Sequence, residues 1–289
     1  MTRTTVRLFT PGPGHAPALA KICFEAFGTL QDRHRVERDF ASLQMAEQVM
    51  GMLVSRPDFF GVAAELDGQI VGSNFLQLSD AVAGVGPITV SPGTQARGIG
   101  RLLMEAVLNE ARRRGVHRVR LQQEAINTAS LSLYTRLGFI WREACVLMRP
   151  GASAVHDPAA RPARAEDLPA IAALGERVQG ASRRSEVAGA ISAGMPASVL
   201  EREGRIVAYH LPGFFGHGFA ETQADLLRLI GQSMRGVPDV FDKIIVPLSQ
   251  FDLHAGLLER GGRSVKLFNY MTVGPFHRPE GGWVPSIGC

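Results

Sequence analysis

The sequence has few cysteines, few aromatic side chains and no long apolar run. Its three cysteines, Cys23, Cys145 and Cys289, are odd in number and far apart, which argues against a disulfide framework and a clustered zinc site. No stretch approaches the about 18 consecutive apolar residues of a membrane span, and the first residues do not lead into a signal-type segment. We therefore expect reduced cysteines, no membrane association and a cytoplasmic location.

Several catalytic and binding motifs are also missing. There is no Gly-x-Ser-x-Gly, His-Glu-x-x-His or Cys-x-x-Cys pattern, and the eight histidines lack metal-ligand spacing, so we expect no metal. Three tyrosines and two tryptophans are too few for the interleaved basic and aromatic residues of a single-strand binder, so we do not expect nucleic-acid binding. The arginines between residues 112 and 120 fit either a solvated helix end or a contact to a polyanion.

The length and apolar content predict two domains. The chain has 289 residues, of which 45% are hydrophobic, enough for more than one core. An Ala- and Pro-rich stretch at residues 151–160 predicts a linker between domains at residues 1–150 and 161–289. Helical and β-type patterns occur in both parts, so the expected class is α/β.

The first part begins with two expected helices and a hairpin. Apolar residues recur at helical spacing over residues 16–27 and 40–54. Asp67-Gly68 then separates two β-prone runs at residues 60–66 and 70–78, and an Asp-Gly pair in this position is a strong hairpin signal. A short β-branched run at residues 87–90 follows and leads into a glycine-containing loop.

That loop, Val90 to Gly100, is the most informative stretch of the chain. Pro92-Gly93 ends the strand, and from Ile99 onward the apolar residues follow a helical stripe. Gly98 and Gly100 therefore lie at the start of a helix, where backbone N–H groups lack intrahelical partners and a ligand can approach closely. The pattern predicts an anion site.

Two common anion motifs do not fit this loop. A dinucleotide fingerprint needs a third glycine and an acidic residue about 20 positions later, where this chain has Arg118 and Arg120. A phosphate loop starting at Gly93 would require Lys and Ser or Thr after Gly98, but Ile99 and Gly100 follow. The remaining pattern is Gln95-x-x-Gly98-x-Gly100.

This pattern resembles the pyrophosphate loop of the GCN5-related N-acetyltransferases (GNAT), which has Arg or Gln, two residues, Gly, one residue, and Gly or Ala. A second stretch, Asn127 to Phe139, resembles the other GNAT signature through its Asn, Leu-Tyr and Gly-Phe elements. The order of helices, hairpin and loop is also that of the family. The resemblance covers residues 4–149 and implies the GNAT fold, in which a mixed sheet is flanked by helices.

The resemblance implies that acetyl-CoA is the acetyl donor, with its pantetheine arm along Ile88 to Val90. A backbone N–H near Val90 could stabilise the oxyanion. Tyr134 would protonate the departing thiolate, because a phenol and a thiol differ in pKa by only about two units. The implied cofactor-binding residues are Ile88, Thr89, Val90, Gln95, Ala96, Arg97, Gly98, Ile99, Gly100, Arg101, Asn127 and Ser130.

The general base is less determined by the sequence. Family members often carry a Glu on the strand before the loop, but residues 85–89 contain no carboxylate. Glu124, at the end of the neighbouring strand, is the candidate base, and a solvated strand-end carboxylate is an equal interpretation. Glu25 on the first helix and water are further alternatives.

The second part repeats the first weakly, so the chain resembles a tandem GNAT protein. Asp167 to Ile171 opens a helix as residues 15–19 do, and Gly204 lies at a hairpin turn like that at Gly68. The loop does not recur, because residues 214–221 lack its glycine spacing and carry Glu221, and Leu258 replaces Tyr134. We therefore expect a degenerate, non-catalytic second domain.

Two functions follow as hypotheses. The first is an N-acetyltransferase that moves the acetyl group of acetyl-CoA to a primary amine of a small molecule or peptide by direct attack. The alternative is a non-catalytic acyl-CoA-binding sensor or scaffold. The second domain would either close the acceptor pocket or form a homodimer surface, with the Pro- and Gly-rich tail at residues 276–287 packed across a domain surface.

Overall fold

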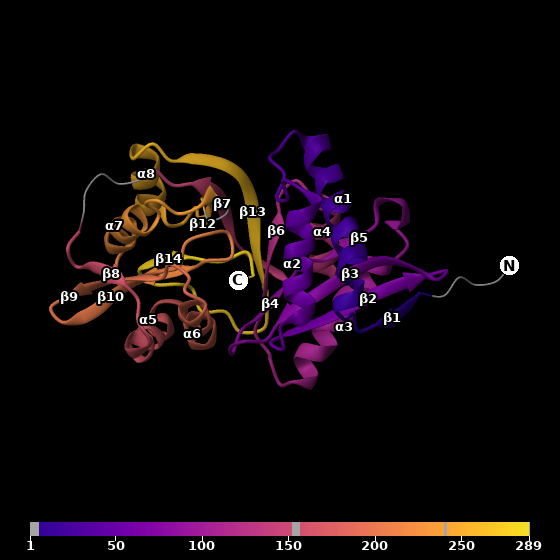
Figure 1. The fold of residues 1–289 in the computed structure, drawn as a ribbon, viewed down its shortest axis with the longest axis horizontal. Coiled ribbons are helices and arrows are strands. Elements are labelled where there is room, and N and C mark those ends of the chain that lie inside the picture. The colour runs from indigo at the N-terminus through magenta and orange to yellow at the C-terminus, as the bar shows by residue number, and fades with distance from the viewer. Residues whose placement is uncertain (1–5, 152–156, 240–241, 289) are drawn as a thin grey trace.

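The computed structural model describes residues 6–151, 157–239 and 242–288 of the chain. Residues 6–149, the first half, and 157–288, the second half, lie side by side (Figure 1). The elements of the first half are β1 (Arg7–Phe9), α1 (Ala16–His34), α2 (Leu43–Ser55), β2 (Phe59–Leu66), β3 (Gln69–Gln77), β4 (Ala83–Val85), β5 (Thr89–Val90), α3 (Ile99–Arg113), β6 (Val119–Glu124), α4 (Thr128–Arg136) and β7 (Ile140–Arg149).

The second half follows a similar order. Its elements are β8 (Ala160–Pro162), α5 (Leu168–Gln179), α6 (Arg184–Ser192), β9 (Ser198–Arg202), β10 (Arg205–His210), β11 (Gly218–Ala220), α7 (Gln223–Ser233), β12 (Ile244–Pro247), α8 (Phe251–Glu259), β13 (Arg263–Val273) and β14 (Gly282–Val284). The α/β class with mixed sheets and flanking helices is confirmed. The expected hairpin is β2–β3, with positive φ at both Asp67 and Gly68, as a tight hairpin turn requires.

The larger sheet contains strands from both halves. Its order is β1-β2-β3-β4-β6-β13-β7-β12, with β5 paired to β3. Strand β13 of the second half lies between β6 and β7, so that Phe268 faces Glu124 on one side and Cys145 on the other. On the far side β7 pairs with β12. The two halves thus exchange their last strands, and β13 is visible at the centre of Figure 1.

The predicted domain division therefore crosses a continuous sheet. Half of the linker expected at residues 151–160, namely residues 152–156, lies outside the described residues, and the described part ends at Ala160, the first residue of β8. The division of the chain at this point stays a prediction. What the structure adds is that hydrogen bonds between β13, β6 and β7 join the two parts of the chain into one sheet.

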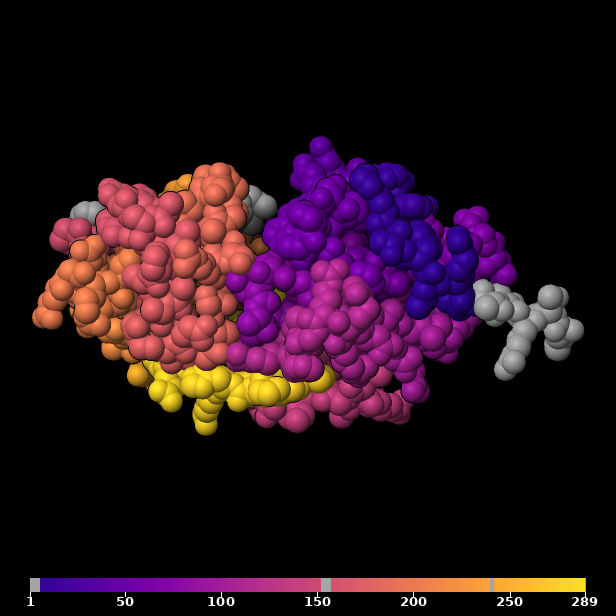
Figure 2. Space-filling view, turned by 90° about the horizontal axis from the view of Figure 1, so that it is seen from below, coloured from indigo at the N-terminus to yellow at the C-terminus, as the bar shows by residue number. Residues whose placement is uncertain are grey.

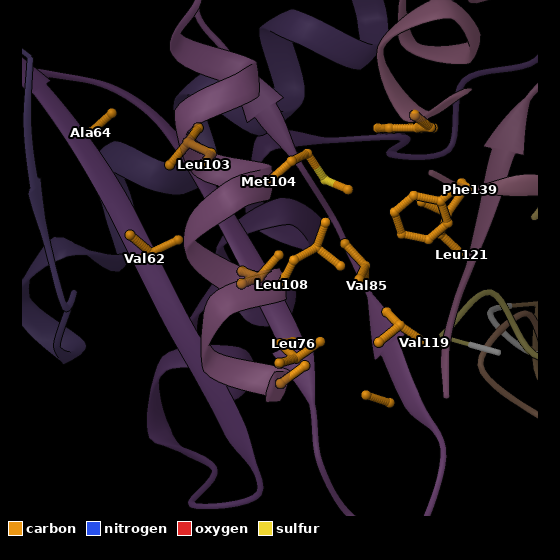
Figure 3. Close-up of a cluster of buried hydrophobic side chains, with 14 of the residues drawn as sticks. Val62, Ala64, Leu76, Val85, Leu103, Met104, Leu108, Val119, Leu121 and Phe139 are labelled. Atoms are coloured by element: carbon orange, nitrogen blue, oxygen red, sulfur yellow. The ribbon is translucent and has the colours of Figure 1, made fainter. Parts of the chain in front are cut away.

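The core of the first half fixes the start of α3. Leu103, Met104 and Leu108 on one face of α3 are buried against strands β2, β3, β4 and β6 (Figure 3). Each such side chain contributes about 1.5–3 kcal/mol when it is fully buried. Because Ile99 at the first helical position is also buried, the helix N-terminus is held in place on the sheet.

The smaller sheet and the tail complete the contact between the halves. Its order is β14-β11-β10-β9-β8. Asp80 of the first half accepts the backbone N–H groups of Ser185 and Glu186 at the start of α6, and Gln77 donates to Glu186 at 2.6 Å. Beyond β14 the tail continues along both halves, where it forms the yellow band in Figure 2, and Gly288 reaches Gly84 of β4. The tail does pack across a domain surface.

Candidate functional site

The glycine-containing loop has the conformation that an anion site requires. Gly98 has φ of 80° and is the N-cap of α3, and Ala96 has φ of 64°. The first intrahelical bond runs from the Leu102 N–H to the Gly98 carbonyl. The N–H groups of residues 99–101 consequently have no intrahelical acceptor and are directed out of the helix end. Such N–H groups, together with the positive end of the helix dipole, favour an anion at this position.

Gln95 ties this loop to the preceding strand. Its Nε2 donates to the Val90 carbonyl at 3.1 Å. The Ser91 N–H donates to the Val71 carbonyl of β3, and backbone groups alternate in direction along a strand. The N–H and C=O of Val90 therefore point away from β3, on the side where Gln95 lies. This is the free edge to which an extended ligand could add.

Strands β4 and β6 separate next to this edge. They pair in parallel at their starts, where Ala83 faces Val119 and Gly84 faces Arg120. Further along, Thr89 and Val90 pair with β3, whereas Glu124 at the end of β6 pairs with Phe268 of β13. The separation that the sequence hypothesis required between residues 88–90 and 119–124 is present.

A cavity of about 700 Å³ opens at this separation. All but two of the fourteen predicted site residues line it, and the exceptions are Arg97 and Glu124. Helix α1 forms another wall through residues that include Phe27, Leu30, Arg33 and His34. The cationic side chains of the lining are Arg33, Arg101 and Arg136, and the lining contains no carboxylate. Its electrostatic character suits a polyanionic ligand.

Tyr134 enters the cavity from α4. The N-cap of this helix is Asn127, whose side chain accepts the Ser130 N–H at 3.1 Å. The Tyr134 ring is 6% exposed and packs at 6.0 Å from the ring of Phe139. Burial raises the pKa of Tyr134 above its ordinary value, and a hydrogen bond with Ser130 opposes part of this effect. The phenol therefore keeps its proton at neutral pH and is a weaker acid than a phenol in water.

Glu124 faces a different set of partners. Its carboxylate lies 2.7 Å from the Lys266 ammonium of β13, and Gln31 of α1 donates to both carboxylate oxygens. Lys266 also reaches Asp39, at 2.7 Å, in the connection between α1 and α2. Burial raises the pKa of Glu124, and the Lys266 charge acts in the opposite direction. Glu124 is thus part of a buried charged cluster behind the cavity wall, and its role as a base stays a prediction.

Two polar residues of the site had no signal in the sequence. Gln123 of β6 donates to the Asn127 carbonyl at 2.6 Å and to Ser130 Oγ at 3.0 Å. Asn269 of β13 donates to Gln123 Oε1 at 2.7 Å. Neither lies in a recognisable motif, and the contact between them depends on β13 pairing with β6.

The corresponding place in the second half is filled by the chain itself. Strand β14 pairs with β11, and Trp283 is buried against Tyr270. Gly281 and Gly282 lie against the start of α7, where an added Cβ would meet the carbonyls of residues 220–222 within 3 Å. In the first half the equivalent position, between β5 and the start of α3, belongs to the cavity.

Two searches of the described residues gave no result. None of the helices in residues 6–151, 157–239 and 242–288 is long and apolar enough to cross a membrane. In the same ranges, no three His, Cys, Asp or Glu side chains are grouped so that they could hold a metal ion.

In a comparison with protein families, residues 20–139 match the model of the acetyltransferase (GNAT) family. The mycothiol acetyltransferase of Beutenbergia cavernae is 40% identical over 74 residues, which cover 25% of this chain and 25% of that protein. The mycothiol acetyltransferase of Arthrobacter sp. is 29% identical over 152 residues, covering 50% and 45%. The chain thus matches a quarter to about half of the length of these curated relatives.

The fold likeness extends over the whole chain. A putative acetyltransferase from Pyrococcus horikoshii superposes with a TM-score of 0.78, covers 99% of this chain and 95% of its own, and is 15% identical. At this identity the likeness shows the fold alone. It includes the second half, whose order of helices and strands parallels that of the first.

Proposed function

Because residues 20–139 match the model of the acetyltransferase (GNAT) family, we propose that the cavity binds acetyl-CoA and that the protein is an N-acetyltransferase. The acceptor is a primary amine of a small molecule or peptide. One observation carries the proposal: the helix N-terminus at residues 98–101, the free edge at Val90 and the Tyr134 side chain all line one cavity. The helix N-terminus would bind the pyrophosphate of a CoA thioester, the strand edge its pantetheine arm, and Tyr134 would serve as the proton donor at the thioester.

In this proposal the pyrophosphate accepts hydrogen bonds from the free N–H groups of residues 99–101. The pantetheine arm extends along β5, and the Val90 N–H points toward the thioester carbonyl, where it stabilises the oxyanion formed by amine attack. Tyr134 then donates its proton to the thiolate as the C–S bond breaks, and the acetyl group stays on the amine. Arg101 and Arg136 add positive charge to the cavity lining.

The acceptor must lose a proton before or during attack, and no carboxylate lines the cavity. We propose Glu124 as the final proton acceptor, reached through water from behind the wall. Its raised pKa brings it closer to the pH at which a base works best. Replacement of Glu124 by Gln tests this role. The value of kcat/KM should fall, and the pH profile of kcat/KM should lose its acidic limb. An unchanged pH profile would assign proton removal to bulk water.

The proposed function is tested by thiol release from acetyl-CoA with a panel of primary amines. Tyr134→Phe should lower kcat by about a hundredfold or more, the usual contribution of a general acid, and leave the Kd of acetyl-CoA within about twofold. Tyr209→Phe is the matched control, because Tyr209 is fully buried in the second half, away from the cavity. Equal turnover in wild type and Tyr134→Phe would refute the acid role.

The second candidate, an acyl-CoA-responsive sensor or scaffold, rests on the absence of a carboxylate from the lining. Tight binding of acetyl-CoA without release of thiol for any amine of the panel would support it. We also propose that the second half is non-catalytic, because β14 fills the position that corresponds to the cavity.

A further inference from the structure

Strand β13 brings a polar side chain of the second half to the network that holds Tyr134. Asn269 lies directly opposite Gln123 in the β6–β13 ladder. Asn269 Nδ2 donates to Gln123 Oε1 at 2.7 Å, and Asn269 Oδ1 accepts from Trp141 Nε1 at 2.9 Å. Gln123 Nε2 in turn donates to Ser130 Oγ at 3.0 Å, and Ser130 lies one helical turn before Tyr134 on α4. The chain of hydrogen bonds runs from Trp141 through Asn269 and Gln123 to Ser130.

The direction of every bond in this chain is fixed by its two ends. At one end Gln123 Nε2 faces the backbone carbonyls of Glu124 and Asn127, which can only accept. At the other end the Trp141 indole can only donate. Gln123 must therefore turn its Oε1 toward Asn269, and Asn269 must offer its amide to Gln123 and its oxygen to Trp141. Among side chains of this size, only an amide has a donor and an acceptor in these positions.

The network also fixes the helix that carries Tyr134. Gln123 contacts the Asn127 carbonyl, and Asn127 is the N-cap of α4. Ser130 and Tyr134 are four residues apart, one turn of the same helix, so a shift of Ser130 moves the neighbour of the phenol directly. The amide of Gln123 is the link between the sheet and this helix face. Its own orientation depends on Asn269.

We infer that Asn269 is a positioning residue for Tyr134, supplied to the site of the first half by the second half. The expected effect on turnover rests on the proposed function, whereas the hydrogen-bond geometry does not depend on it. Asn269→Asp preserves size and shape but removes the donor, so that Gln123 must turn its amide to the new carboxylate. Gln123 Oε1 would then face Ser130 Oγ and two carbonyls, so the bond from Gln123 to Ser130 would be lost and Asn127 alone would hold the Ser130 side chain.

The experiment compares wild type, Asn269→Asp, Tyr134→Phe and the double variant. Asn269→Asp should lower kcat by about tenfold to a hundredfold, the effect of a misplaced catalytic group, while the Kd of acetyl-CoA stays within about twofold. In the Tyr134→Phe background the same substitution should lower kcat no further. Asn109→Asp, on the exposed side of α3, is the control for the chemical change itself. An equal loss in both backgrounds would overturn the inference, since it would show an effect that does not pass through Tyr134.

A second measurement does not depend on turnover. The chain has only three tyrosines, so the resonances of isotope-labelled tyrosine Cζ can be assigned with single Phe variants. Asn269→Asp and Ser130→Ala should both shift the Tyr134 resonance and leave that of Tyr209 in place. An unshifted Tyr134 resonance in folded Asn269→Asp would refute the inference. Absence of turnover in wild type, with the shift observed, would refute the proposed function and leave the positioning role standing.

Discussion

The buried cluster around Lys266 should respond sharply to removal of its one cation. The Lys266 side chain is 3% exposed, and its ammonium lies 2.7 Å from both Glu124 and Asp39, whose side chains are 5% and 13% exposed. Lys266→Met keeps the length of the side chain and removes the charge. Two carboxylates would then lie close together with Gln31 as their shared donor.

Removing one partner of a buried ion pair costs about 3–5 kcal/mol, because the remaining charge stays desolvated without compensation. We expect Lys266→Met to lower the unfolding free energy by this amount at neutral pH. Glu124→Gln should cost less, about 1–2 kcal/mol, because Lys266 keeps Asp39 and an amide still bonds. The double variant should recover part of the loss, because it leaves one carboxylate where the single variant leaves two.

The cost of Lys266→Met should also depend on pH. Without the ammonium, the pKa of Glu124, already raised by burial, rises further above its unfolded value of about 4.3. Between these two values the folded protein binds more protons than the unfolded protein, so its stability falls as pH increases. The difference from wild type should therefore be larger at about pH 8 than at about pH 5.

Urea denaturation followed by tryptophan fluorescence measures these quantities. Lys243→Met is the matched control, because Lys243 forms a more exposed pair with Glu37, which also keeps Arg149. That change should cost at most about 1 kcal/mol. A Lys266→Met cost below about 1 kcal/mol, or one that is equal at both pH values, would refute the account of the cluster.

The remaining predictions concern the loop and a buried histidine. A Cβ on Gly100 would lie 3.5 Å from Leu133 Cδ2, so Gly100→Ala should fold with unchanged stability, whereas Gly100→Leu should weaken acetyl-CoA binding in calorimetry by about tenfold or more; unchanged affinity would contradict the site. His210 is fully buried and its pKa is lowered to about 3 by burial, so stability should fall by about 1.4 kcal/mol per pH unit below its unfolded pKa of about 6.5. In urea titrations His210→Gln should reduce this slope and exposed His117→Gln should not; equal slopes would refute the assignment.

The parts of the site that were predictable from sequence are local in the chain. Gly98 and Gly100 follow a strand and precede an amphipathic helix, and Asn127 precedes a short helix that ends at Gly138. Gly98 and Gly138 have positive φ, and Asn127 caps its helix with its side chain, so these three residue types are required by their own backbone positions. Such requirements can be recognised from the sequence without knowledge of which strands are neighbours. Gly98, Gly100 and Asn127 line the cavity, and Gly138 does not.

The parts that were not predictable depend on strand order. An alternating pattern tells which side chains of β6 share a face, but it does not identify the strand that lies beside them. The sequence hypothesis placed Glu124 near the cofactor arm, with β6 separated from β5. Glu124 instead meets Lys266, because β13 from the far end of the chain occupies the space beside β6. No local signal in residues 263–273 indicates this.

The exchange of last strands gives the second half a structural role in the site of the first. Without β13, the edge of β6 would be open. Gln123 Oε1 would lose the hydrogen bond that Asn269 donates to it, and Glu124 would be a buried carboxylate without a cation. None of these contributions requires a cofactor in the second half, where β14 already fills the corresponding position. The last strand of the second half is therefore held by its contacts with the first half, at Lys266 on one face and at Asn269 on the other, independently of any ligand of the second half.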